Sequence, residues 1–244
     1  MRVVAPFAAL GLLTVIPSPL STARASTLGR SVAYFPLVGA LLGAIVAAFD
    51  AVATVPLPPT VASVLDVGLL ALLSGGLHLD GLADSADGLF ASGGRARRLE
   101  VMRDSHTGAF AVAAVTLVLL LEVASLAAIP RSIRAPALIA GCASSRWAMA
   151  VALVAFPAAR SEGLAATFRA AAGPVDLVIA TALVALVVLP LLLGSGLALI
   201  GAAAAVALAV GLFARSRLGG VTGDVCGAAG ELSFAAQLVF LAAR

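Results

Sequence analysis

The chain has 244 residues, of which 62% are hydrophobic and only 11% charged, and its formal net charge is +3. A soluble domain carries about 25% charged residues, so this sequence has too few polar side chains to cover a globule in water. The composition therefore predicts an all-α, polytopic membrane protein, and no basic stripe is interleaved with stacking aromatic residues, so we expect no nucleic-acid partner. We treat residues 1–244 as a single integral membrane domain.

The first apolar stretch, Val3 to Ile16, is short and is followed by prolines. A spanning helix needs about 20 mostly apolar residues, so we expect this stretch to lie in the membrane interface or to form a re-entrant segment. Together with Ala23-Arg24-Ala25 it also imitates a secretory signal peptide. Cleavage before Ser26 is therefore an alternative.

Seven longer apolar stretches satisfy the length criterion for spanning helices. They lie near residues 31 to 55, 60 to 82, 108 to 130, 135 to 158, 174 to 193, 195 to 214 and 226 to 243. Cytoplasmic loops are enriched in basic residues. If the first stretch does not span, most loop arginines share one side, which makes loops 83 to 107, 159 to 173 and 215 to 225 cytoplasmic. Arg131 and Arg134 are exceptions, because this topology places them outside.

Three of the twelve acidic residues fall within the segment GGLHLDGLADSADGLF, at Asp80, Asp84 and Asp87. On a helix, spacings of four and seven residues place these carboxylates on one face, where like charges repel. Ionisable groups in an apolar helix are costly and usually functional. We therefore predict a site for a hard divalent cation such as Mg²⁺, which shares its ligands with water and substrate phosphates. The alternative is a solvated helix end, or pairing with the arginines just downstream.

Two polar residues lie apart from this carboxylate face. His78 is two residues before Asp80, about 200° away around an ideal helix, so we expect it to contact substrate or to close the site. Arg146 falls in the middle of a predicted span, where it requires a counter-charge or an aqueous cavity. Both an ion pair with Glu122 and a contact with a substrate phosphate satisfy that requirement.

Two further segments reach the predicted cytoplasmic side. They are RDSHTG, with Arg103, Asp104 and His106, and GGVTGD, with Thr222 and Asp224. Each precedes the start of a predicted helix, where backbone N–H groups favour anions. His106 titrates near neutral pH, which makes it a candidate general base or phosphate ligand.

Five motifs are spread along the chain: FPLVGALLG (35 to 43), GGLHLDGLADSADGLF (75 to 90), RDSHTGAF (103 to 110), SRWAM (145 to 149) and TGDVCGAAGE (222 to 231). Together they resemble cobalamin synthase, the adenosylcobinamide-GDP ribazoletransferase family. The resemblance implies a Mg²⁺-dependent, multi-pass enzyme of the cytoplasmic (inner) membrane whose site faces the cytoplasm. Such an enzyme joins adenosylcobinamide-GDP to α-ribazole, or its 5′-phosphate, and releases GMP in the last steps of cobalamin biosynthesis.

With this reaction in view, the candidate residues take three roles. We expect metal ligation by Asp80, Asp84, Asp87 and Asp224, catalysis by Asp104 and His106, and substrate binding by His78, Arg98, Arg103, Arg146 and Thr222. The expected partners are the two substrates and the lipid bilayer. A homo-oligomer or a complex with other cobalamin-pathway enzymes stays open.

Two other functions were weighed against this one. A CDP-alcohol phosphotransferase also displaces a nucleoside monophosphate with an alcohol, but its pattern requires Asp and Arg where this chain has Leu77 and Asp84. A cation or metabolite transporter would place its carboxylates near the bilayer midplane and would use paired broken helices in two halves. Here the acids gather at one face and the sequence has no twofold repeat.

Overall fold

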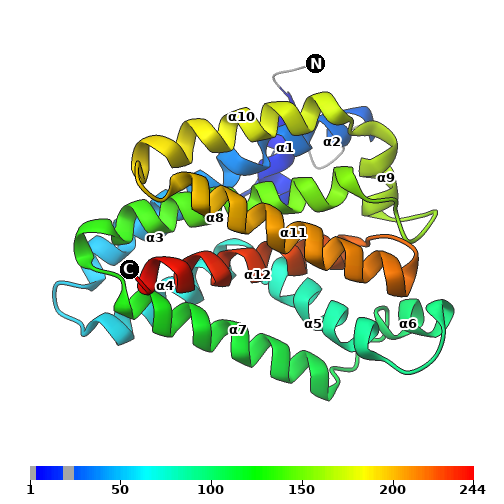
Figure 1. Cartoon of the computed structure of the whole chain (residues 1–244), viewed down its shortest axis with the longest axis horizontal. Helices are drawn as coiled ribbons and strands as arrows, with labels where there is room; N and C mark the ends of the chain where they lie inside the picture. The colour runs from blue at the N-terminus through cyan, green and yellow to red at the C-terminus, as the bar shows by residue number, and fades with distance from the viewer. Residues whose placement is uncertain (1–3, 19–24) are drawn as a thin grey trace.

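The computed structural model describes residues 4–18 and 25–244, which form a bundle of helices (Figure 1). The helices are α1 (Val4–Leu13), α2 (Ala25–Ser31), α3 (Phe35–Ala53), α4 (Pro59–Leu73), α5 (Leu77–Phe90), α6 (Arg95–Val101), α7 (Ala109–Ala128), α8 (Arg131–Ala155), α9 (Leu164–Ala171), α10 (Pro174–Leu191), α11 (Gly196–Leu218) and α12 (Gly223–Ala242). Val3 and residues 23 and 24 of the signal-peptide-like pattern lie outside the described ranges.

Most of the bundle consists of membrane-spanning helices. Within the described ranges, six helices are long and apolar enough to cross a bilayer: the segment Thr27–Ala53, which ends in α3, and α7, α8, α10, α11 and α12. A seventh span results if α4 and α5 cross together. The predicted polytopic helix bundle is therefore confirmed. With 10 residues, α1 is about 15 Å long against a hydrocarbon core of about 30 Å, so it is too short to span.

The chain reversals gather at two opposite ends of the bundle. Figure 1 shows α6, α9 and the end of α11 at the right-hand end, and the C-terminus near the turn between α3 and α4 at the left-hand end. The loops that follow α5, α8 and α11 therefore share one end, as the arginine pattern predicted. These loops carry the motifs around Arg103, Arg160 and Thr222.

The predicted span from 60 to 82 is wrong as one continuous helix, because the chain breaks it into α4 and α5 with a bend of 89°. Gly75 and Gly76 adopt φ values of +63° and +70°, a left-handed conformation that glycine enters without steric cost. Gly76 N–H donates to the carbonyl of Ala71 at 2.8 Å and ends α4. Val15, just after α1, donates its N–H to the carbonyl of Leu73 at 2.9 Å. The acidic segment thus lies on a helix of its own.

The helix α8 is the core of the bundle, since every residue from Ala140 to Leu153 is buried. It packs tightly against α3 at Gly39 and Gly43, where an added Cβ would overlap the α8 backbone at Cys142 and Leu138. Small residues four apart allow this close approach of membrane helices. Dispersion contacts between closely packed surfaces therefore hold the two central spans together.

Arg134 does not behave as a loop charge, although the sequence placed it outside. Its Nε lies 3.0 and 3.1 Å from the two carboxylate oxygens of Asp50 on α3, and its Nη2 lies 3.0 Å from Asp66 Oδ2 on α4. The side chain is 1% exposed. This buried ion cluster joins α3, α4 and α8. Arg134 therefore contributes to helix packing, and its position does not indicate which side of the membrane the loop faces.

Candidate active site

The carboxylates of α5 and α12 meet where the two helices touch. Gly81 on α5 faces the start of α12, where an added Cβ would lie 2.8 Å from the carbonyl oxygen of Asp224. The missing side chain therefore allows Asp224 to approach the carboxylate face of α5. Asp80, Asp224 and Asp87 all lie near enough for their charges to act on Asp84. The four residues predicted to bind metal therefore lie in one neighbourhood, and metal binding by them stays a prediction.

Thr222 shapes the first turn of α12. Its Oγ1 accepts a hydrogen bond from Val225 N at 3.2 Å, and its hydroxyl donates to Asp224 Oδ2 at 3.1 Å. Such a capping side chain satisfies one of the free N–H groups at the helix start. Thr222 is buried and holds the carboxylate of Asp224 in place, which gives it a positioning role.

The charge of Arg160 acts on this acidic centre. In the sequence, Arg160 is one of the loop arginines that indicate the cytoplasmic side, and no motif assigns it to the site. Ala159 N–H donates to Val221 O and Val221 N–H donates to Pro157 O, both at 2.8 Å, so the loop after α8 is pinned to the loop before α12. Burial lowers the pKa of Arg160, while the charges of Asp224 and Asp84 oppose that shift. No hydrogen-bond partner for its buried Nε exists among the described residues. Arg160 is therefore a site residue that no motif indicated.

Asp87 connects the acidic helix to α7. Its Oδ2 accepts from Gly108 N at 2.6 Å and its Oδ1 accepts from Ala111 N at 3.0 Å. These two bonds satisfy N–H groups at the start of α7, where the helix dipole also favours a negative charge. Each oxygen keeps a second lone pair, so metal ligation by Asp87 stays a prediction alongside this structural role.

Asp104 and His106 form an exposed pair on the loop before α7. His106 Nδ1 lies 2.6 Å from Asp104 Oδ1, and the side chains are 92% and 54% exposed respectively. The hydrogen bond from His106 lowers the pKa of Asp104, and the same contact raises the pKa of His106. Their catalytic role stays a prediction. The bond between Gly108 and Asp87 anchors the end of their loop to α5.

His78 and Arg146 lie in a second, buried polar cluster behind the acidic face. Arg146 Nη2 is 3.4 Å from His78 Nδ1, and Arg146 Nη1 donates to Ser145 Oγ at 2.8 Å. Glu231 Oε1 is 3.8 Å from His78 Nδ1, and the charges of Glu122 and Arg146 act on each other. Arg146 is 2% exposed, and no ion pair between it and Glu122 is found among the described residues, so both alternatives for Arg146 stay open. Sequence reasoning had left Glu231 without a role.

The two remaining candidate arginines differ in access. The guanidinium of Arg98 is buried and donates to the carbonyl of Leu89 near the end of α5. A cation at a helix C-terminus stabilises the unpaired carbonyls there. Arg103 is exposed, and its charge acts on Arg160. The exposed guanidinium of Arg103 is thus accessible to an anionic substrate, whereas that of Arg98 is bonded to the end of α5.

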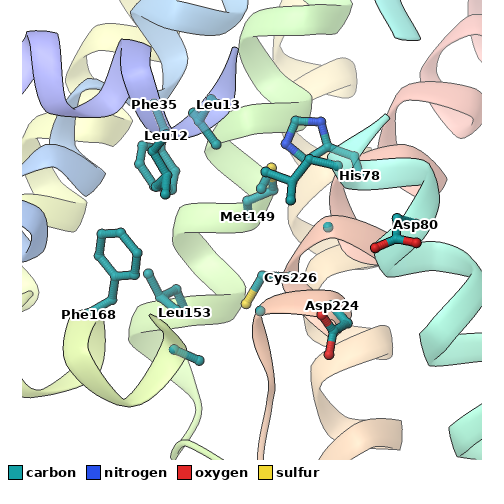
Figure 2. Close-up of a pocket in the computed structure, with 14 residues that line it drawn as sticks. Leu12, Leu13, Phe35, His78, Asp80, Met149, Leu153, Phe168, Asp224 and Cys226 are labelled. Atoms are coloured by element: carbon teal, nitrogen blue, oxygen red, sulfur yellow. The ribbon is translucent and has the colours of Figure 1, made fainter. Parts of the chain in front are cut away.

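A cavity adjoins the acidic centre. Its walls come from α1, α3, α5, α8, α9 and α12, and most of the lining side chains are apolar. Figure 2 shows Phe35, Leu12 and Phe168 on one side of it, and Asp80 and Asp224 on the other. The sequence gave no indication of this cavity, because its apolar lining cannot be told from lipid-facing residues by composition.

The donor set at the acidic centre fits Mg²⁺ in kind, since all four side chains offer carboxylate oxygens. Within residues 4–18 and 25–244, no three His, Cys, Asp or Glu side chains stand close enough to enclose an ion by themselves. Mg²⁺ usually needs no such cage, because one or two carboxylates, water and substrate phosphates complete its shell. Its binding here stays a prediction.

Comparison with known proteins gives a consistent result over almost the whole chain. Residues 5–242 match the family model described as cobalamin-5-phosphate synthase. The adenosylcobinamide-GDP ribazoletransferase of Geotalea daltonii is 41% identical over 93% of this chain and 92% of its own length. The enzymes of the same name from Desulforamulus reducens and Roseiflexus are 39% and 36% identical, over 92% and 97% of this chain and 90% and 89% of their own lengths. No solved structure matches the chain.

Proposed function

Because the chain belongs to the cobalamin-5-phosphate synthase family, we propose that it is an adenosylcobinamide-GDP ribazoletransferase. A ribose hydroxyl of α-ribazole, or of its 5′-phosphate, attacks the cobinamide-side phosphorus of the diphosphate. The bond from that phosphorus to the bridging oxygen breaks, GMP leaves with this oxygen, and the hydroxyl proton is released. The observation that best supports this chemistry is the meeting of the α5 carboxylates with Asp224 beside Arg160.

We assign the carboxylates of Asp80, Asp84, Asp87 and Asp224 to Mg²⁺. When bound there, Mg²⁺ supplies charge neutralisation on the diphosphate and on the leaving GMP. Gly81 lets the two helices approach, and Thr222 fixes the carboxylate of Asp224. The chain thus orients its donors before substrate arrives, which is the main contribution that a protein makes to phosphoryl transfer.

Arginine side chains and the Asp104–His106 pair complete the proposed chemistry. Arg160 and Arg103 bind the diphosphate, because guanidinium groups match phosphate oxygens, Arg160 lies near Asp84 and Asp224, and Arg103 lies near Arg160. When His106 is neutral and donates through Nδ1 to Asp104, its Nε2 accepts the proton of the attacking hydroxyl. The anchoring of this loop to Asp87 keeps the pair close to α5.

The proposed membrane is the cytoplasmic membrane, with the site facing the cytoplasm. The arginine-rich loops after α5, α8 and α11 share the end of the bundle that carries the acidic centre, and such loops favour the cytoplasmic side. All proposed site residues belong to one chain. The site is therefore complete whether the protein works alone, as a homo-oligomer, or with other enzymes of the cobalamin pathway.

The test is GMP release and adenosylcobalamin formation by purified protein in lipid, given adenosylcobinamide-GDP, α-ribazole and Mg²⁺. Asp84→Asn should lower kcat by about 100-fold or more, because metal-assisted charge stabilisation contributes several kcal/mol. Glu100→Gln is the matched control, since Glu100 lies at the same end in an exposed pair with Arg97. Equal activity of Asp84→Asn and wild type would overturn the metal assignment. Formation of CMP from a CDP-lipid and an alcohol, without cobalamin, would favour the CDP-alcohol phosphotransferase.

A further inference from the structure

The cavity beside the acidic centre shares residues with it. Asp80 and Asp224 line the cavity and also belong to the four carboxylates predicted to bind Mg²⁺ beside the reacting diphosphate. When the attacking hydroxyl of a substrate lies at these carboxylates, the rest of that substrate can therefore extend into the cavity. The apolar lining then selects which kind of chemical group enters.

We propose that this cavity is the subsite for the base of α-ribazole, an inference that rests on the proposed function. The base is a flat, bicyclic benzimidazole with two methyl groups, and one ribose ring separates it from the attacking hydroxyl. Placing the base in the cavity therefore puts the ribose between the cavity and Asp80 and Asp224. The diphosphate of the second substrate then occupies the adjoining pocket, which Arg160 and Thr222 line and which shares Asp224 with the cavity.

The lining of the cavity suits such a base. It is mostly apolar with a few polar side chains, as is typical of small-molecule sites. Phe35 and Phe168 form an edge-to-face pair with ring centroids 6.2 Å apart and planes at 77°. Their rings, with Met149 and Leu153, offer an apolar surface that excludes water from the two methyl groups. A charged or phosphorylated group would lose its hydration there without compensation.

His78 supplies the polar group that fixes the orientation of the base. It lines the cavity, and no partner for its buried Nε2 is found in the part of the chain that the structure describes. Arginine only donates hydrogen bonds, so the tautomer of neutral His78 that pairs with Arg146 accepts at Nδ1 and carries its proton on Nε2. A buried N–H without a partner is unfavourable. The unprotonated ring nitrogen of benzimidazole accepts a hydrogen bond from this group.

The first experiment compares the two substrates in one variant. Phe168→Ala removes part of the cavity wall and should raise KM for α-ribazole about tenfold or more while KM for adenosylcobinamide-GDP changes less than twofold. Phe213→Ala is the matched control, because Phe213 packs against Phe90 on α5, away from the cavity. Leu12→Trp, at a half-buried position on α1, narrows the cavity without emptying the core and should also weaken α-ribazole selectively.

The second experiment varies the substrate. In wild type, a benzimidazole riboside without the methyl groups should have a kcat/KM lower by roughly tenfold or more, since a group of this size in an apolar pocket changes specificity by about 10–200-fold. Phe168→Ala should reduce this discrimination. Direct binding of α-ribazole to the protein in lipid nanodiscs, without the second substrate, should weaken in the same variants.

The outcomes separate this inference from the proposed function. If wild type forms cobalamin but Phe168→Ala and Leu12→Trp leave KM for α-ribazole unchanged, the subsite assignment is wrong and the function stands. A rise only in KM for adenosylcobinamide-GDP would assign the cavity to the other substrate. Retention of a lipid acyl chain in the cavity at saturating α-ribazole would also overturn the inference. If wild type forms no cobalamin, the function itself fails, whatever the variants do.

Discussion

Two groups of carboxylates in this protein face opposite demands. In the cluster of Asp50, Asp66 and Arg134, the guanidinium contacts both acids and all three side chains are buried. At the acidic centre, four carboxylates gather near Arg160, and Asp80 stays exposed while Asp84 is half-buried. Arg134 pairs with both acids of the first cluster, whereas no ion pair is found for the carboxylates of the second among the described residues. We therefore infer a structural role for the first cluster, beside the ligand-binding role proposed for the second.

Among the variants proposed here, removing the cation of the Asp50–Asp66–Arg134 cluster should lower the stability of the fold most. Arg134→Met leaves Asp50 and Asp66 buried without a counter-charge, and breaking a buried ion pair in this way costs about 3–5 kcal/mol. The measurement is thermal unfolding of the purified protein in detergent. Arg131→Met, an exposed neighbour that donates to the carbonyl of Thr54, should change stability little. A melting temperature of Arg134→Met equal to that of wild type would show that the cluster is dispensable.

The stability of the protein should also depend on ligand binding at the acidic centre. We expect Mg²⁺ with GMP to stabilise wild type by about 2.7 kcal/mol at a concentration a hundredfold above Kd, because binding favours the folded state. Chelation should reverse this gain and abolish activity without unfolding the protein. Asp84→Asn should fold normally but lose the shift, as seen by thermal unfolding. An identical shift in Asp84→Asn would place the ion elsewhere.

The contribution of Arg160 should be smaller and confined to one substrate. Replacing it by glutamine removes hydrogen bonds to a charged group that contribute about 1.5–3 kcal/mol, so KM for adenosylcobinamide-GDP should rise about 10- to 150-fold. Arg97→Gln provides the control, since Arg97 is exposed and pairs with Glu100. Similar kinetics in both variants would remove Arg160 from the site.

The exposed Asp104–His106 pair should give the smallest effect on stability. Because the pKa of His106 is raised, its contribution is present below the ordinary histidine pKa and is lost as pH rises through the raised value. Because the pKa of Asp104 is lowered, its contribution is lost only as pH falls through that lowered value. NMR titration of labelled histidine should show the His106 pKa falling in Asp104→Asn. An unchanged titration would mean that the contact is absent in solution.

The sequence predicted the fold best where a simple physical rule applies. Length and hydropathy located the spans, because a helix in lipid must be long and apolar. The helical phase separated His78 from Asp80, and the structure places His78 inside the bundle and Asp80 at its surface. The break at Gly75 and Gly76 was missed, because an apolar window does not register two residues with positive φ.

Tertiary contacts account for the parts of the site that sequence reasoning did not find. The charges of Arg160 and Asp224 act on each other because the loop after α8 pairs with Val221, a contact between segments about 60 residues apart. The cavity draws its lining from six helices, none of which carries a distinctive motif for it. Substrate binding by Arg98 and Arg146 stays a prediction, and residue type alone could not show that both also have partners within the bundle.

The hydrogen bond from Val15 to Leu73 also bears on how the protein can be engineered. Deleting the segment through Ile16 would expose the carbonyl of Leu73 at the end of α4, where lipid offers no donor, and would strip Leu12 and Leu13 from the cavity. The short N-terminal helix is thus a fixed part of the catalytic scaffold. Affinity tags and fluorescent fusions belong at the C-terminus, at the opposite end of the bundle from the acidic centre.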